Sequence, residues 1–173
     1  MRIVGFIALV LWLPLLRAET LEVSSKAQPF GLLSNDHSVQ WALAQIESGH
    51  LKRPDTARGN SGEVSRYQIL PKTWRLYSHS RNYSDPVIAW TVARKILCDR
   101  QEWFTRLAGR APTAFDLYVI WNKPSVYQRI GFEPHRLPSR IRDVARRFSN
   151  LVESAEQQLV SAPKLRAAAL AQE

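Results

Sequence analysis

The chain has 173 residues, of which 45% are hydrophobic and 23% are charged, and its formal net charge is +9. This size and composition fit one globular domain and exclude a wholly disordered chain. Cys98 is the only cysteine, which excludes an internal disulfide, and we expect it to be a small buried hydrophobe. No metal or nucleotide motif is present, so the sequence predicts no cofactor.

Residues 1–18 have the layout of a secretory signal peptide, with a basic start, an apolar run and a small-residue cleavage site at Ala18. The run is shorter than the roughly 20 residues of a comfortable membrane span. We therefore expect export and no stable membrane insertion after cleavage. An uncleaved anchor and a buried N-terminal helix are the alternatives.

Export changes the meaning of the positive charge, which is still about +7 once Arg2 and Arg17 are removed. Inside a cell this surplus would suggest nucleic acid, whereas outside it the abundant polyanions are the cell wall and lipid headgroups. We therefore expect no nucleic-acid partner. A basic surface without a dedicated partner is the alternative.

The first predicted helix follows residues 19–34, which show no helical period and are interpreted as extended. Asn35 and Asp36 are favourable N-cap residues, and apolar side chains recur at helical spacing as far as Ile46. Gly49 suits the left-handed residue that ends many helices. The sequence predicts a helix between these signals.

The next segment predicts a small β or irregular insertion. Residues 50–62 are polar and contain helix breakers, which is typical of a loop. Residues 64–70 have the length of a short strand or hairpin, and Pro71 begins a short helix.

Capping signals then mark a long helix. Ser84 or Asp85 caps it, Pro86 takes its first position, and Gly109 follows its last apolar residue. A further helix, which Thr113 is placed to cap, carries apolar residues toward an aromatic end.

Residues from Pro124 to Pro138 are expected to form a second irregular stretch. A last long helix starts at about Ser139, with one apolar face and, on the other, Arg140, Arg142, Arg146 and Arg147. The chain is thus mainly α: a domain over residues 35–124, and a helical extension over 125–173 packed on the same domain.

Glu47 is the first candidate for chemistry. It borders the apolar stripe of its helix and lies in the last turn, where the helix dipole disfavours a negative charge. An apolar flank adds desolvation, and both effects raise the pKa of a carboxyl toward that of a general acid. A solvated helix-end glutamate is the alternative.

Two other segments mix polar and aromatic side chains. In residues 62–69, Tyr67 and Gln68 fit either the lining of a polar cleft or an amphipathic strand with Tyr67 and Ile69 in the core. Asn122 ends an apolar run just before a proline, where it either caps a helix or presents its amide to a ligand.

In their order and spacing these motifs resemble the soluble lytic transglycosylase and goose-type lysozyme superfamily. The family has a Glu-Ser pair, a Gly-aromatic-or-Met-Gln-hydrophobic segment and an aromatic-Asn-Ala-Gly turn. The counterparts here are Glu47-Ser48, Tyr67-Gln68 and Asn122. The resemblance covers residues 35–124, and no single motif is specific.

The resemblance implies a lysozyme-like α+β domain that acts on peptidoglycan glycan strands in the periplasm, or as a secreted protein. It makes Glu47 the catalytic acid and base and Ser48 a neighbour that orients substrate. It places Tyr67 and Gln68 on the cleft wall and matches Asn122 to the last motif. Two departures are Ser65 in place of glycine, and Lys123-Pro124 in place of Ala-Gly.

The implied reaction is cleavage of the bond between N-acetylmuramic acid and N-acetylglucosamine with a 1,6-anhydro product, so that one carboxyl suffices. Glu63 opens an alternative, because a second carboxylate across the cleft would activate water and make a hydrolytic muramidase. A solvated Glu63, or one paired with Arg66 or Arg58, is the simpler interpretation.

Two interpretations of the chain as a binding protein and not an enzyme stay open. One is a catalytically inactive wall-binding module, in which cleft, aromatics and basic face hold glycan or locate a cell-envelope machine. Another is a nucleic-acid or membrane binder that uses the arginine face of the last helix, against which the export signal argues. We expect a monomer.

Overall fold

The computed structural model describes residues 36–170, and their side chains as far as residue 161. The predicted signal peptide (1–18) and the extended segment 19–34 lie outside the described residues. The helices of the described part are α1 (Asp36–Ser48), α2 (Pro71–Tyr77), α3 (Pro86–Ala108), α4 (Ala114–Asn122), α5 (Pro124–Arg129) and α6 (Ser139–Leu170), with the short 3-10 helices η1 (Pro54–Thr56) and η2 (Pro134–Arg136). The prediction of a mainly helical chain is confirmed.

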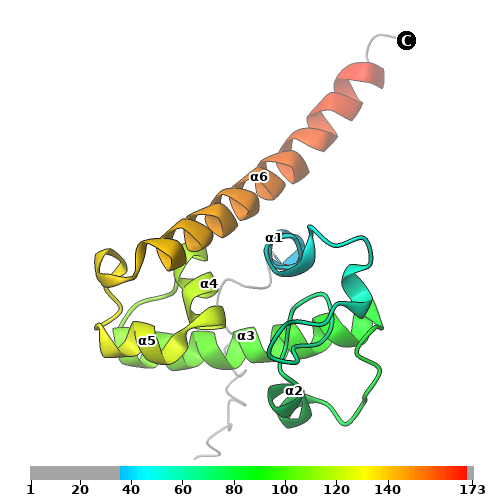
Figure 1. Cartoon of the computed structure of the whole chain (residues 1–173). Helices are drawn as coiled ribbons and strands as arrows, with labels where there is room; N and C mark the ends of the chain where they lie inside the picture. Colours follow the sequence, from blue (N-terminus) through cyan, green and yellow to red (C-terminus); the bar gives the residue numbers. More distant parts are fainter. Residues whose placement is uncertain (1–35, 171–173) are drawn as a thin grey trace, which may run out of the picture.

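The long helix α3 runs across the molecule beneath α1, α4 and α6 (Figure 1). The helices α4 and α5 lie at one end of α3, and α2 with the segment 49–70 lies at the other. The helix α6 packs across α1 and α4 and then continues away from them. No helix in the described part of the chain is long and apolar enough to cross a membrane.

One core joins all these elements. Its largest fully buried side chains come from the segment before α2 and from α2, α3, α5, α6 and α1: Tyr67, Trp74, Phe104, Tyr127, Phe148 and Leu43. The helix α6 contributes Ala145, Phe148 and Val152. The apolar face predicted from Ser139 onward is therefore the face that packs on the domain.

Local capping explains where α3 and α4 begin and end. The Asp85 carboxylate accepts the N–H groups of Val87 and Ile88, and Gly109 ends α3 with a φ of 69°. Thr113 and Asp116 form a reciprocal capping box at the start of α4. The predicted start and end of α3 and the predicted start of α4 are confirmed.

Gly49 differs from its prediction. It follows α1 as expected, but its φ is not positive, so it is not a left-handed cap. Its N–H donates to Gln45 O at 3.2 Å, and an added Cβ would lie 2.7 Å from that same oxygen. Glycine is required here by close backbone approach.

The segment 64–70 contains no strand, only isolated bridges from Val64 to Arg58 and to Ile69. Val64 and Ile69 exchange two backbone hydrogen bonds of 2.9 Å and close a tight four-residue turn between them. Within that turn Ser65 (φ 65°) and Gln68 (φ 48°) are left-handed. The expected small insertion is thus an irregular turn.

The prediction of a wholly irregular stretch from Pro124 to Pro138 is wrong in part, because α5 and η2 lie within it. Pro124 takes the first position of α5, where a missing N–H has no cost and the fixed φ favours a helix. Gly131, with a φ of 72°, follows the end of that helix.

Candidate active site

Glu47 lies in the last turn of α1 and is partly buried. The indole Nε1 of Trp121 donates to its Oε1 at 3.1 Å. The Tyr118 hydroxyl is hydrogen-bonded to the same carboxyl. Both donors belong to α4, three residues apart and therefore on one face of that helix.

Burial raises the pKa of Glu47 from 4.5 to about 7, because it removes water from the charged form. The hydrogen bonds from Trp121 and Tyr118 act in the opposite direction, and the nearby negative charge of Glu63 adds to the rise. With a pKa of about 7, the Glu47 carboxyl is substantially protonated at neutral pH. When it ionises, Trp121 and Tyr118 donate hydrogen bonds to its negative charge.

Asn122 is joined to Glu47 through Tyr118. Its Nδ2 donates to the Tyr118 oxygen at 3.1 Å, while its side chain is exposed. The Tyr118 ring packs against Phe148 of α6, with 5.5 Å between ring centroids. The predicted site residue Asn122 is thus one hydrogen bond removed from the carboxyl, and α6 supports the residue between them.

Arg100 of α3 holds the end of α4 that carries Trp121. Its Nη1 donates to Ile120 O at 3.0 Å and also to Trp121 O, and its guanidinium lies over the Trp121 ring at 5.5 Å. Burial lowers the pKa of Arg100. A buried guanidinium that caps helix carbonyls and packs on a ring fixes the indole that reaches Glu47.

Ser48 links α1 to the turn 64–70. It is fully buried, and its Oγ donates to Arg66 O at 2.8 Å. Arg66 in turn pairs with Asp55, with 2.9 Å from Nη2 to Oδ2. In this arrangement Ser48 holds the turn against the helix that carries Glu47. A contact between Ser48 and substrate stays a prediction.

Tyr67 is also fully buried, and its ring packs near Trp90 with 5.6 Å between centroids. With Ile69 buried as well, these two side chains take the core positions of the alternative interpretation. Gln68 is half-buried, and its Nε2 donates to Ser65 O at 2.9 Å.

Glu63 and Gln68 meet above Gly59. A Cβ on Gly59 would lie 2.2 Å from Glu63 Oε2 and 2.6 Å from Gln68 Oε1, so a larger residue there would displace the ends of both side chains. Glu63 is half-buried, and its Oε2 accepts the Ser61 N–H at 2.9 Å. No ion pair of the described residues includes Glu63, and Arg66 is paired with Asp55 instead.

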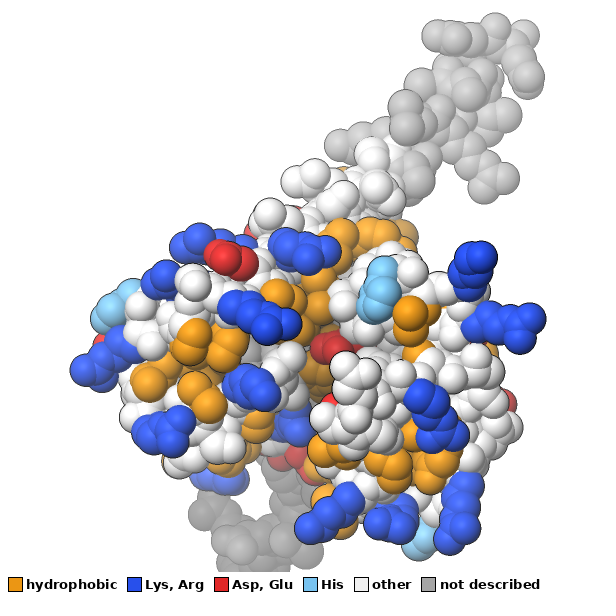
Figure 2. Space-filling model, viewed as in Figure 1, with side chains coloured by type: hydrophobic (Ala, Val, Ile, Leu, Met, Phe, Trp, Pro, Cys, Tyr) orange, Lys and Arg blue, Asp and Glu red, His pale blue; other side chains and the backbone are white. Residues whose placement is uncertain are grey.

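The surface is hollowed between the half made by α4 and α5 and the half made by α1 and the segment 49–70, and acidic side chains lie where the halves meet (Figure 2). Lysine and arginine side chains surround this hollow on both sides. Between residues 36 and 161 no group of three or more His, Cys, Asp and Glu side chains is placed to hold a metal ion.

Sequence reasoning missed Tyr118, Trp121 and Arg100. The available signal was the pair Tyr118 and Trp121, two aromatic residues with polar tips at helical spacing, since buried tyrosine and tryptophan usually bond through those tips. Comparison with protein-family models, curated proteins and solved structures finds no match. The family resemblance therefore rests on the sequence motifs.

Proposed function

We propose that the chain is an exported peptidoglycan lytic transglycosylase with a lysozyme-like α+β domain, in which Glu47 is the acid and then the base. The observation that carries the proposal is the Glu47 carboxyl itself. It is desolvated, its pKa is about 7, and two aromatic donors of α4 contact it. The isolated bridges of Val64 to Arg58 and to Ile69 lie where this proposal places the small insertion of the domain.

In the first step, protonated Glu47 donates its proton to the oxygen that links N-acetylmuramic acid to N-acetylglucosamine. The bond to the anomeric carbon breaks, and the N-acetyl oxygen of the substrate stabilises the positive charge there. Glu47 becomes ionised at this moment. The hydrogen bonds from Trp121 and Tyr118 then strengthen, since each is made to a full negative charge.

In the second step, ionised Glu47 accepts the proton of the sugar's 6-hydroxyl, whose oxygen closes the 1,6-anhydro ring on the anomeric carbon. The enzyme thus returns to its protonated state without a second carboxyl. A pKa of about 7 suits both steps, because the same group has to give and take a proton near neutral pH.

Glu63 supports a second candidate, a hydrolytic muramidase. Its carboxylate is close enough to raise the pKa of Glu47, and it forms no ion pair with the side chains of residues 36–161. In that reaction Glu63 would accept a proton from water as the water attacks the anomeric carbon, and the product would carry a reducing end.

Digestion of purified wall sacculi with mass analysis of the products tests the proposal. Anhydro ends are expected from the wild-type chain and none from Glu47→Gln, which keeps the shape of the side chain and loses the titratable proton. Glu102→Gln is the matched control, because Glu102 is an exposed glutamate on α3. Reducing ends that disappear in Glu63→Gln would replace the transglycosylase by the muramidase.

Sacculi that are bound but left intact by the wild-type chain would instead identify a wall-binding module. Cleavage by Glu47→Gln within severalfold of wild type would refute the assignment of Glu47. Exported location, peptidoglycan as partner and a monomeric state are parts of the same proposal.

A further inference from the structure

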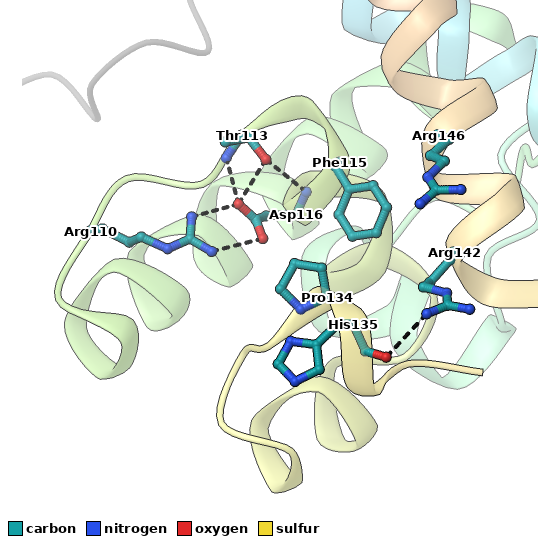
Figure 3. A pocket seen from close by; sticks show the side chains of 8 residues that line it. All are labelled: Arg110, Thr113, Phe115, Asp116, Pro134, His135, Arg142 and Arg146. Carbon is teal, nitrogen blue, oxygen red and sulfur yellow. Dashed lines mark hydrogen bonds and ion pairs between the residues drawn. The ribbon is translucent and has the colours of Figure 1, made fainter. Parts of the chain in front are cut away.

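An open pocket of about 500 Å³ lies between the first turn of α4, η2 and the first turns of α6. Arg142 and Arg146, one turn apart on α6, face the ring of Phe115 and Pro134 (Figure 3). The side chain of Arg110 enters from the other side of Phe115, toward Asp116. Positive charge and a flat apolar wall are thus adjacent.

Asp116, the acidic group among the described residues that line this pocket, is already satisfied. Asp116 accepts hydrogen bonds from Arg110 (2.6 and 3.0 Å), from the Thr113 N–H and hydroxyl, and from the Tyr127 hydroxyl. Burial opposes its charge, but these hydrogen bonds hold the pKa of Asp116 below its ordinary value. Arg110 and Asp116 therefore cancel each other.

The two arginines of α6 carry the remaining charge. Arg142 donates from Nη1 to the backbone oxygen of His135 at 3.1 Å. Among the described residues its charge has no ion-pair partner, and its buried Nε has no hydrogen-bond partner. Arg146 takes part in none of the ion pairs formed by residues 36–161. Unpaired guanidiniums beside an apolar surface are suited to a carboxylate that is attached to an apolar or backbone portion.

The pocket and Glu47 share α4. Phe115 precedes Tyr118 by three residues, so the two lie on one face of α4 and about 4.5 Å apart along its axis. Tyr118 is hydrogen-bonded to Glu47. One turn of α4 thus separates a residue of the pocket wall from the tyrosine that contacts Glu47.

We propose that this pocket binds a carboxylate of the peptide stem that peptidoglycan carries, with Arg142 and Arg146 as its partners and Phe115 as the apolar wall. The identity of this ligand rests on the proposed function. Inorganic phosphate, which lacks an apolar portion, is expected to bind more weakly than the peptide.

Calorimetric titration of the full chain with the free peptide L-alanyl-γ-D-glutamyl-meso-diaminopimelyl-D-alanine tests the proposal. Arg146→Gln and Arg142→Gln are each expected to weaken binding about tenfold, the usual size for a charge-assisted hydrogen bond. Arg140→Gln is the matched control, an exposed arginine of the same helix outside the pocket, and is expected to change binding less than twofold. The same peptide with amidated carboxylates is expected not to bind.

Equal loss in Arg140→Gln, unchanged binding in Arg146→Gln, or full binding of the amidated peptide would each overturn the proposal. Phosphate that binds more tightly than the peptide would overturn the peptide assignment. Arg146 has no ion-pair partner among the described residues, so its variant decides the result if Arg142→Gln disturbs η2. The peptide contains no glycosidic bond, so the outcome is independent of whether Glu47 cleaves glycan.

Discussion

Trp121 donates its indole N–H to the carboxyl of Glu47, 74 residues away in the sequence, at 3.1 Å and so joins the ends of α4 and α1. This bond stabilises ionised Glu47 and opposes the burial that favours the protonated form. The state of the carboxyl therefore depends on α4 as much as on its own helix.

Trp121→Phe keeps most of the aromatic packing and removes the donor. Since the lost bond favours the ionised form, we expect the pKa of Glu47 to rise above about 7, by roughly one pH unit. Carboxyl ¹³C NMR titration measures this directly. The alkaline limb of the glycan-cleavage profile is expected to move upward with it, while the maximal rate falls because the ionised state is less stabilised.

Trp103→Phe is the control for this substitution. Trp103 is a partly buried tryptophan of α3 that packs on Phe132, with 5.6 Å between ring centroids. It is expected to leave the pKa of Glu47 where it was. A Glu47 titration that is identical in wild type and Trp121→Phe would contradict the role given to the indole.

Local signals allowed much of the fold to be predicted. Asp85, Thr113 and Gly109 act on backbone groups within a few residues of themselves, so their effect can be inferred from neighbours in the sequence. Gly49 was misinterpreted because close approach of the Gln45 carbonyl and a left-handed φ both favour glycine. Only coordinates distinguish the two causes.

The site was predictable only in part, because some of its contacts join residues that are distant in the sequence. The position of Glu47 at the end of an apolar stripe follows from its own helix. The partners Trp121 and Arg100 come from α4 and α3, and their relation to Glu47 is created by packing. For Tyr67, the alternation of polar and apolar residues allowed either a position on the cleft wall or one in the core. The structure places it in the core.

Glu47→Gln is expected to stabilise the fold at alkaline pH. The pKa of Glu47 is about 7 in the folded chain against 4.5 for the free group, so the folded state binds a proton that the unfolded state releases. The stability that this proton confers is complete below pH 4.5 and is lost as pH rises through about 7. The variant avoids the loss, which we place at about 1–3 kcal/mol.

Urea unfolding at pH 4.5 and pH 8.5 checks this expectation. The free energies of unfolding of variant and wild type are expected to converge at the lower pH and to differ in favour of the variant at the higher one. A constant difference at both values would show that the pKa of Glu47 is not raised by folding.

Arg100→Met removes the guanidinium that caps α4 and lies over Trp121. We expect a loss of about 1–3 kcal/mol in the free energy of unfolding, because two carbonyl contacts and a ring contact are lost. The pKa of Glu47 is also expected to rise, since the indole is less well held. A merely structural role would leave that pKa unchanged once the protein is folded.

Arg106→Met is the matched control, an exposed arginine nearer the end of the same helix. It is expected to change neither quantity appreciably. Arg100→Lys retains a cation but not the planar fork, so it is expected to recover only part of both losses. The Trp121 indole N–H resonance, followed in the same samples, reports whether the ring has moved.

Ser65 has a φ of 65° inside the turn that Ser48 holds against α1, and its backbone region favours glycine. Ser65→Gly removes this strain but also loses the bond from the Tyr67 N–H to Ser65 Oγ, which is long at 3.3 Å. We expect the two effects to leave stability within about 1 kcal/mol of wild type, and Ser65→Val to lose roughly 2 kcal/mol or more. Thermal unfolding ranks the variants, and a β-branched residue tolerated as well as glycine would mean that this turn opens without cost.

Because the turn is attached to the helix that carries Glu47, Ser65→Val is also expected to reduce glycan cleavage, whereas Ser65→Gly is expected to retain it.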